Sequence, residues 1–183
     1  MGKLFNIDEI ESTLVTIESL PRNPFHAKDW SSHLYACFDE FISAEHFQTI
    51  HDISAKHGHS KVLNILSYEN HEEGRDNQGN SIVAEWKIPF SWSEYERIVR
   101  PSYWSHHGLY IWPERRTWAI VTTTLEYNVI GGNPEFIAAY EAAMGGRDVI
   151  AKEFYENVTS GFVNQSPEGA DSLLRNFYPE FSR

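Results

Sequence analysis

Residues 109–132 read LYIWPERRTWAIVTTTLEYNVIGG, and their pattern indicates the centre of a β-sheet. Two runs rich in β-branched and aromatic residues, 109–112 and 117–124, flank the sequence Pro-Glu-Arg-Arg, which is typical of a turn. The pattern predicts two antiparallel strands joined by a short connection. A further short strand is predicted over 127–130.

Two more strands are predicted on the N-terminal side of this stretch. Residues 62–68 form a nearly continuous apolar run, and residues 82–90 alternate between apolar and other side chains. Between them, 70–81 reads NHEEGRDNQGNS, which favours a long exposed hairpin loop. The period of two predicts that one set of side chains shares a buried face while Glu85 and Lys87 face outward. That set is Ile82, Ala84, Trp86, Ile88 and Phe90.

Helical spacing dominates the N-terminal part of the chain. Apolar residues recur at helical intervals from Ile7 to Ile17, with Asn6 as a capping residue and Pro21 beyond the end, so a helix is predicted there. A second helical region is predicted over 29–57, with Ser43 as a candidate break and Gly58 as its end.

Helices also follow the strands. A short helix is predicted to start at Ser91 and to stop near Pro101, and Asn133-Pro134 predicts the start of a helix that ends before two glycines near 145. Two further helices are predicted around 150–158 and from Ser166 onward. Helices at both ends of a run of hairpin-connected strands predict one α+β domain over 1–183, with a central, mainly antiparallel sheet.

The composition limits the classes of function. Hydrophobic residues make up 41% of the 183 positions, which is enough for the core of one domain. Twenty-six acidic residues against fifteen Lys and Arg give a net charge of −11, so phosphate backbones are repelled and no nucleic-acid partner is expected. A basic protein partner fits this charge better.

Other features bear on the compartment. Cys37 is the only cysteine, so an intramolecular disulfide and a cysteine-based zinc site are excluded. The apolar runs are broken by Glu, Asn or Gly, and the first twenty residues do not resemble a secretory signal. A cytoplasmic protein without a membrane partner is therefore expected.

No motif predicts a catalytic residue, a metal or a cofactor. His51, His57 and His59 lie close in sequence, but a histidine pair at a helix end also interacts favourably with the helix dipole, and that role is favoured. Residues 131–132 are two glycines before a helix, yet the glycine patterns of nucleotide-binding loops are absent. Cys37 lies within a helical pattern, where a buried structural thiol is favoured.

Two sets of residues are candidates for binding a partner. The first is an acidic loop comprising Glu69, Glu72, Glu73 and Asp76. The second is the tip of the predicted strand pair, comprising Trp112, Glu114, Arg115 and Arg116. Trp and Arg are enriched at binding hot spots, but packing of Trp in the core beneath a solvated turn is the preferred interpretation of the second set. Likewise, most runs of charge are solvated surfaces.

A resemblance adds a functional expectation. The segments WAIV (118–121), YNVIGG (127–132) and PEFI (134–137) resemble the end of small cytoplasmic bacterial proteins, some of which are similar to immunity proteins of polymorphic toxin systems. The resemblance implies a non-enzymatic inhibitor that binds a cognate toxin.

The first expectation is therefore a protein-binding domain, most concretely an immunity-type inhibitor of a basic toxin. One alternative is a small-molecule- or nucleotide-handling enzyme whose groups would include Tyr103, His106, His107, Glu114, Arg115 and Arg116. Another is a structural or regulatory homo-oligomer that uses the Trp-rich surface. A deep pocket would favour the enzyme, a flat acidic surface the inhibitor, and an apolar two-fold patch the oligomer.

Overall fold

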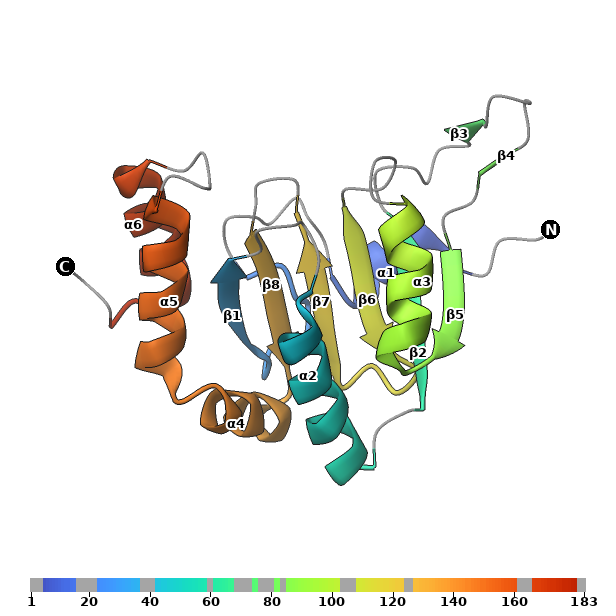
Figure 1. The fold of residues 1–183 in the computed structure, drawn as a ribbon, viewed down its shortest axis with the longest axis horizontal. Coiled ribbons are helices and arrows are strands. Elements are labelled where there is room, and N and C mark those ends of the chain that lie inside the picture. Colours follow the sequence, from blue (N-terminus) through green and yellow to red (C-terminus); the bar gives the residue numbers. More distant parts are fainter. Residues whose placement is uncertain are drawn as a thin grey trace.

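A six-stranded antiparallel sheet forms the centre of the fold, with helices packed around it (Figure 1). This computed structural model describes residues 5–15, 23–36, 42–58, 61–67, 74–75, 81–82, 85–102, 108–123, 127–160 and 166–180. The strand order is β1-β8-β7-β6-β2-β5, and a separate small ladder joins β3 to β4. The α+β class predicted from the sequence is confirmed.

The elements have the following bounds. The strands are β1 (Ser31–Ala36), β2 (Val62–Ser67), β3 (Gly74–Arg75), β4 (Ser81–Ile82), β5 (Glu85–Pro89), β6 (Leu109–Pro113), β7 (Trp118–Thr122) and β8 (Tyr127–Gly132). The helices are α1 (Ile7–Thr13), α2 (Ala44–Lys56), α3 (Trp92–Ser102), α4 (Pro134–Ala143), α5 (Arg147–Thr159) and α6 (Pro167–Phe177).

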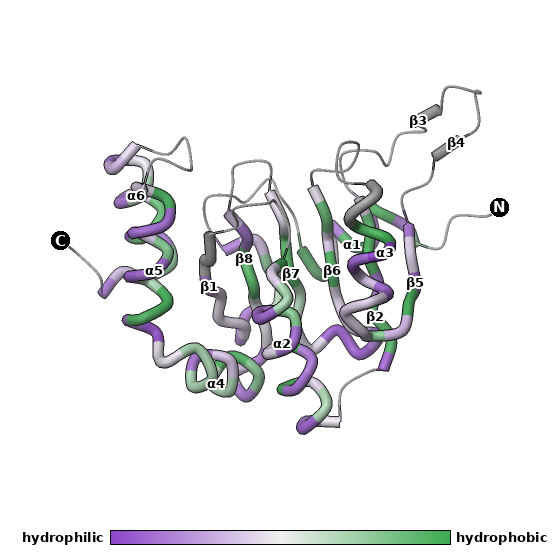
Figure 2. The backbone as a smooth tube through the Cα atoms, viewed as in Figure 1, coloured by the Kyte–Doolittle hydropathy of each residue, from purple (hydrophilic) through white to green (hydrophobic). Residues whose placement is uncertain are grey.

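The stretch 109–132 forms three adjacent strands, as predicted. Ile111 pairs with Ile120, and Ile120 pairs with Ile130 across β6, β7 and β8. Every residue of these three strands is buried, because both faces of the sheet are covered. Figure 2 shows hydrophobic residues dominating these central strands, whereas α2, α3 and α5 carry both kinds of residue. The centre of the sheet is therefore the core of the fold.

The two faces of the sheet are covered by different segments. On the face behind the sheet in Figure 1, α1 and the preceding residue Phe5 pack on β6. The ring centroids of Phe5 and Trp112 lie 5.0 Å apart. On the front face, the Trp118 Nε1–H donates a hydrogen bond to Ser54 of α2 over 2.9 Å, and its ring stacks on Phe136 of α4. Trp112 and Trp118 thus anchor opposite layers.

The prediction of a helical region over 29–57 is wrong in its first part. Residues 31–36 form the edge strand β1, in which His33 pairs with Ile130 of β8. Helical spacing alone did not reveal this pairing, since the partner lies almost a hundred residues away and tertiary pairing overrides local propensity. The helix begins only after Ser43, whose side chain accepts a hydrogen bond from the His46 N–H, and ends before Gly58 at a positive φ of 63°.

The N-terminal helix is shorter than predicted. It ends at Thr13, because Val15 leaves the helix to form a β-bridge with Phe25. The Asn6 cap is confirmed, since its side chain accepts a hydrogen bond from the Asp8 N–H. Ile17 and Pro21 lie outside the described residues.

The predicted strand 82–90 is confirmed over 85–89, whereas Ile82 belongs to β4, which pairs with β3 in the separate ladder and does not continue into β5. Ala84 lies outside the described residues. Ile88 and Phe90 are buried and Lys87 is exposed, as the alternation predicts. Trp86 and Glu85 are both half-buried, so the predicted contrast between them is absent. Glu85 is partly buried because its carboxylate accepts a hydrogen bond from the Phe5 N–H.

The C-terminal helices follow their predicted caps. The side chains of Asn133 and Ser166 accept hydrogen bonds at the starts of α4 and α6, and each helix has Pro in its first turn. Gly131 and Gly132 have a further role. A Cβ at Gly131 would clash with the Phe25 ring, and a Cβ at Gly132 would lie 2.6 Å from the Phe136 ring. Both glycines are therefore required by close packing at the end of β8.

Candidate functional site

The predicted acidic loop falls outside the part of the chain that the structure describes. Outside the described residues lie all four acids of the loop, Glu69, Glu72, Glu73 and Asp76. The neighbouring Gly74 and Arg75 pair with 81–82, which agrees with a hairpin in this region. Binding of a partner by the four carboxylates stays a prediction.

The predicted tip of the strand pair does not form one surface. Trp112 is only 2% exposed and packs on Phe5, so a partner that docks on the folded chain has no access to it. This corrects the inclusion of Trp112 among the binding residues. The reason is that the side chain of Trp112 lies on the face of β6 that the N-terminal segment with Phe5 covers.

The other three tip residues are exposed but engaged within the chain. Glu114 pairs with Lys87 at 2.9 Å, and Arg115 donates to the Gly58 carbonyl at 3.0 Å. Arg116 lies at a positive φ of 49° and pairs with Glu9 at 3.1 Å. These contacts tie the turn to both neighbouring layers.

The histidines near the end of α2 do not converge on one point. His57 Nδ1 lies 2.8 Å from the Glu135 carboxylate in the first turn of α4, whereas His51 pairs with the adjacent Asp52. Within the described ranges, no three His, Cys, Asp or Glu side chains are placed to hold a metal ion. His59, like Cys37, Tyr103, His106 and His107, lies outside these ranges.

A buried polar network surrounds His33, which is 0% exposed. Its Nδ1 accepts from the Arg147 guanidinium at 3.4 Å and lies 3.3 Å from the Tyr178 hydroxyl. A guanidinium only donates, so the ring is neutral with its proton on Nε2. That nitrogen lies 2.8 Å from a carboxylate oxygen of Glu141.

The electrostatics agree with a neutral ring. Burial, followed by the positive charge of Arg147, lowers the pKa of His33 to about 4, although Glu180 acts in the opposite direction. Arg147 also pairs with Glu180 and donates to the Phe177 carbonyl at 2.8 Å. The network thus joins β1 to α4, α5 and the end of α6.

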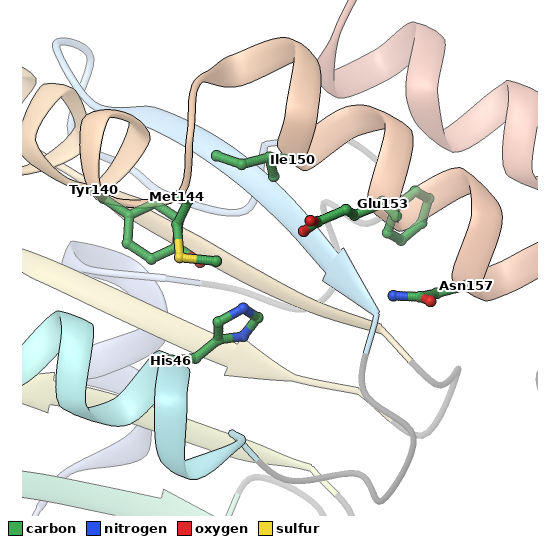
Figure 3. A pocket seen from close by; sticks show the side chains of 7 residues that line it. His46, Tyr140, Met144, Ile150, Glu153 and Asn157 are labelled. Carbon is green, nitrogen blue, oxygen red and sulfur yellow. The ribbon is translucent and has the colours of Figure 1, made fainter.

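A small polar pocket lies between α2, α4 and α5 (Figure 3). Its volume is about 30 Å³, and its lining consists of His46, Tyr140, Met144, Ile150, Glu153, Phe154 and Asn157. Residues four apart on a helix share one face, which brings Tyr140 of α4 near Met144 at the end of that helix and brings Glu153 and Asn157 together on α5. We call this site the polar pocket.

The polar groups of the pocket converge on its centre. Figure 3 shows the His46 ring, the Glu153 carboxylate and the Asn157 amide directed toward the space beside the Met144 thioether. The Tyr140 hydroxyl is fully buried and has no hydrogen-bond partner in the structure. Buried polar groups are almost always hydrogen-bonded, so this hydroxyl marks a place for a ligand or a water molecule.

Burial sets the charge of the pocket. It lowers the pKa of His46, while Glu45 acts weakly in the other direction, so the imidazole is neutral at pH 7. Burial and the nearby Glu153 charge raise the pKa of Tyr140, so its phenol stays protonated. No Lys or Arg belongs to the lining. The single full charge of the pocket is therefore the Glu153 carboxylate.

The sequence pattern alone does not predict this pocket. Its residues come from three helices, and His46 is almost a hundred positions from Tyr140. The only local signal is the spacing of four within α4 and within α5, which many helices share. A volume of about 30 Å³ is small beside that of a typical ligand site and suits a small polar group.

Comparisons with known protein families, with curated proteins and with solved structures found no match. Among the residues that the structure describes, no helix combines the length and the apolar character needed to cross a membrane. Arguments about function therefore depend on the residues themselves.

Proposed function

We propose that the chain is a non-enzymatic protein-binding domain that recognises a basic partner, most concretely as an immunity-type inhibitor of a basic toxin. The observation that carries the proposal is the net charge of −11. Such an excess attracts a cationic protein over long distances and accelerates association at low salt.

The arrangement of the described charges supports this proposal. Lys87, Arg97, Arg116, Arg147 and Lys152 each form an ion pair with a carboxylate of the same chain. Described carboxylates outside these pairs include Asp8, Asp29, Glu45, Asp148, Glu153, Glu168 and Asp171. Ion pairs within the chain thus engage these five cations, and the acids outside the pairs carry the excess negative charge that would attract a basic partner.

The alternatives have less support. An oligomer built on an apolar patch needs several exposed apolar side chains. Among the described residues, the one large hydrophobic side chain that is exposed is Val149, at 40% exposure. The groups offered for an enzyme lie either outside the described residues or at the engaged turn. The polar pocket itself is too small for a typical substrate.

Affinity purification tests the proposal. The tagged chain is incubated with a lysate of the organism that encodes it, and bound proteins are identified and quantified by mass spectrometry. We expect one basic protein in stoichiometric amount, with an association rate that falls as salt is raised. Recovery of nothing except copies of the chain itself would overturn the proposal in favour of an oligomer.

The acidic loop provides a second test once the partner is known. Replacement of Glu69, Glu72, Glu73 and Asp76 by Gln and Asn should slow association and flatten its dependence on salt. Exposed carboxylates act mainly on the association rate, and each is worth only about 0–1 kcal/mol. Neutralisation of Glu168 alone serves as a control and should have little effect. An unchanged rate in the fourfold variant would assign recognition to another surface.

A further inference from the structure

We propose that the polar pocket binds a primary ammonium group, which under the proposed function is the ε-ammonium of a lysine of the basic partner. This inference rests on the proposed function for the source of the amine, but not for the chemistry of the pocket.

The charge of the pocket favours a cation. Glu153 supplies one negative charge and has no Lys or Arg partner among the described residues. The neighbouring cation Lys152 pairs with Glu156 on the exposed side of α5, 3.7 Å away. His46 contributes no positive charge at neutral pH, because its burial favours the neutral ring. A monocation that enters this space therefore meets attraction without a competing charge.

The polar atoms match the hydrogen bonds of an ammonium group. An ammonium has three N–H donors and no acceptor. The Glu153 carboxylate and the unpartnered Tyr140 oxygen are two acceptors that come from two helices and face one space (Figure 3). The Asn157 amide points its nitrogen toward the same space, and a half-turn of the amide brings its carbonyl there as a third acceptor. A charged donor also makes stronger hydrogen bonds than a neutral one, particularly at a buried oxygen. The buried Tyr140 hydroxyl would thereby gain the partner that it lacks.

The size and the walls of the pocket favour a lysine over an arginine. A volume of about 30 Å³ suits a head group of one heavy atom, while a planar guanidinium has four. Met144, Ile150 and Phe154 provide apolar surface at the same site. A lysine side chain can lay its methylene groups along such surface while its charged end reaches the acceptors.

A titration followed by NMR tests the chemistry directly. The ¹⁵N-labelled full chain is titrated with n-butylammonium, n-butylguanidinium or 1-butanol at constant ionic strength. We expect saturable shifts at His46, Tyr140, Glu153 and Asn157 with n-butylammonium, at a concentration about tenfold lower than with either other probe. Equal shifts with butanol would overturn the proposal and indicate an apolar cavity. No shift with any of the three probes would also overturn it.

Matched variants separate the pocket from general acidity. Glu153→Gln should weaken n-butylammonium binding about tenfold, whereas Glu156→Gln, one turn away on the same helix and paired with Lys152, should leave it unchanged. Tyr140→Phe removes only the unpartnered hydroxyl and should weaken binding less, without loss of melting temperature. Equal weakening by Glu153→Gln and Glu156→Gln would overturn a specific site.

The partner distinguishes the two sources of the amine. Acetylation of the partner's lysines should weaken binding to the parent chain about tenfold and should change binding to Glu153→Gln much less. If the partner binds equally well to Glu153→Gln, the lysine assignment fails and the proposed function stands. If n-butylammonium binds but no partner is recovered, the ammonium site stands with a free amine as its ligand, and the proposed function fails.

Discussion

The β6–β7 hairpin and the side of the molecule formed by β1, α4, α5 and α6 are held together in different ways. The hairpin buries apolar side chains on both faces, with one hydrogen bond from Trp118 to Ser54. The other side buries a histidine, an arginine contact and an unpartnered tyrosine hydroxyl. Apolar packing is insensitive to pH, whereas buried polar groups make stability and binding depend on protonation.

The largest expected effect concerns the hairpin side of this comparison. Trp118→Ala removes a 1%-exposed ring that contacts α2 and α4, and should lower the free energy of unfolding by about 3–5 kcal/mol. Urea denaturation measures it. Trp118→Phe keeps most of the ring and should cost less. A loss below about 1 kcal/mol for the alanine variant would contradict the placement of Trp118 in the core.

A pH effect of similar size is expected at His33. Its pKa lies near 6.5 in the unfolded chain and about 4 in the folded chain, so between these values the unfolded state binds more protons. The contribution of the neutral His33 ring to the free energy of unfolding is complete above pH 6.5. It is lost as the pH falls toward 4, and the loss amounts to about 3 kcal/mol at most. His33→Gln should show a shallower decline of unfolding free energy over this range. Parallel curves for parent and variant would disprove the assignment.

Removal of the cation from the same network should have a smaller effect. Arg147→Met leaves Glu141, Glu180 and the Phe177 carbonyl without their donor, and should lower the free energy of unfolding by about 1–3 kcal/mol. The pKa of His33 should also rise, because Arg147 is one cause of its depression. Calorimetry and NMR titration of the imidazole measure the two effects. An unchanged imidazole titration would show that Arg147 does not act on His33.

The smallest effect is expected at the solvated end of the hairpin. Lys87 and Glu114 pair at 2.9 Å, but both side chains are about half exposed. Water and salt screen such pairs, so Glu114→Gln should change the unfolding free energy by less than about 0.5 kcal/mol. A loss above about 1 kcal/mol in urea denaturation would mean that the turn belongs to the stabilising part of the hairpin.

Local patterns predicted the elements whose partners are close in sequence. The hairpin around 113–116, the Asn133 and Ser166 caps and the end of α2 at Gly58 all depend on contacts within a few residues. Periodicity failed at 31–36, where pairing with β8 decides the conformation, and at Val15, where a bridge to Phe25 ends the helix. In both cases a distant partner supplied hydrogen bonds that the local pattern does not encode.

The candidate site follows the same division. The net charge of −11 is determined by the sequence alone, because it follows from the numbers of acidic and basic residues. Whether a side chain is accessible was decided by the tertiary structure, which buried Trp112 and engaged Arg115 and Arg116 within the chain. The polar pocket was likewise created only by folding, since helices from distant parts of the chain bring His46, Tyr140 and Glu153 together, and the loss of solvent there keeps His46 and Tyr140 neutral.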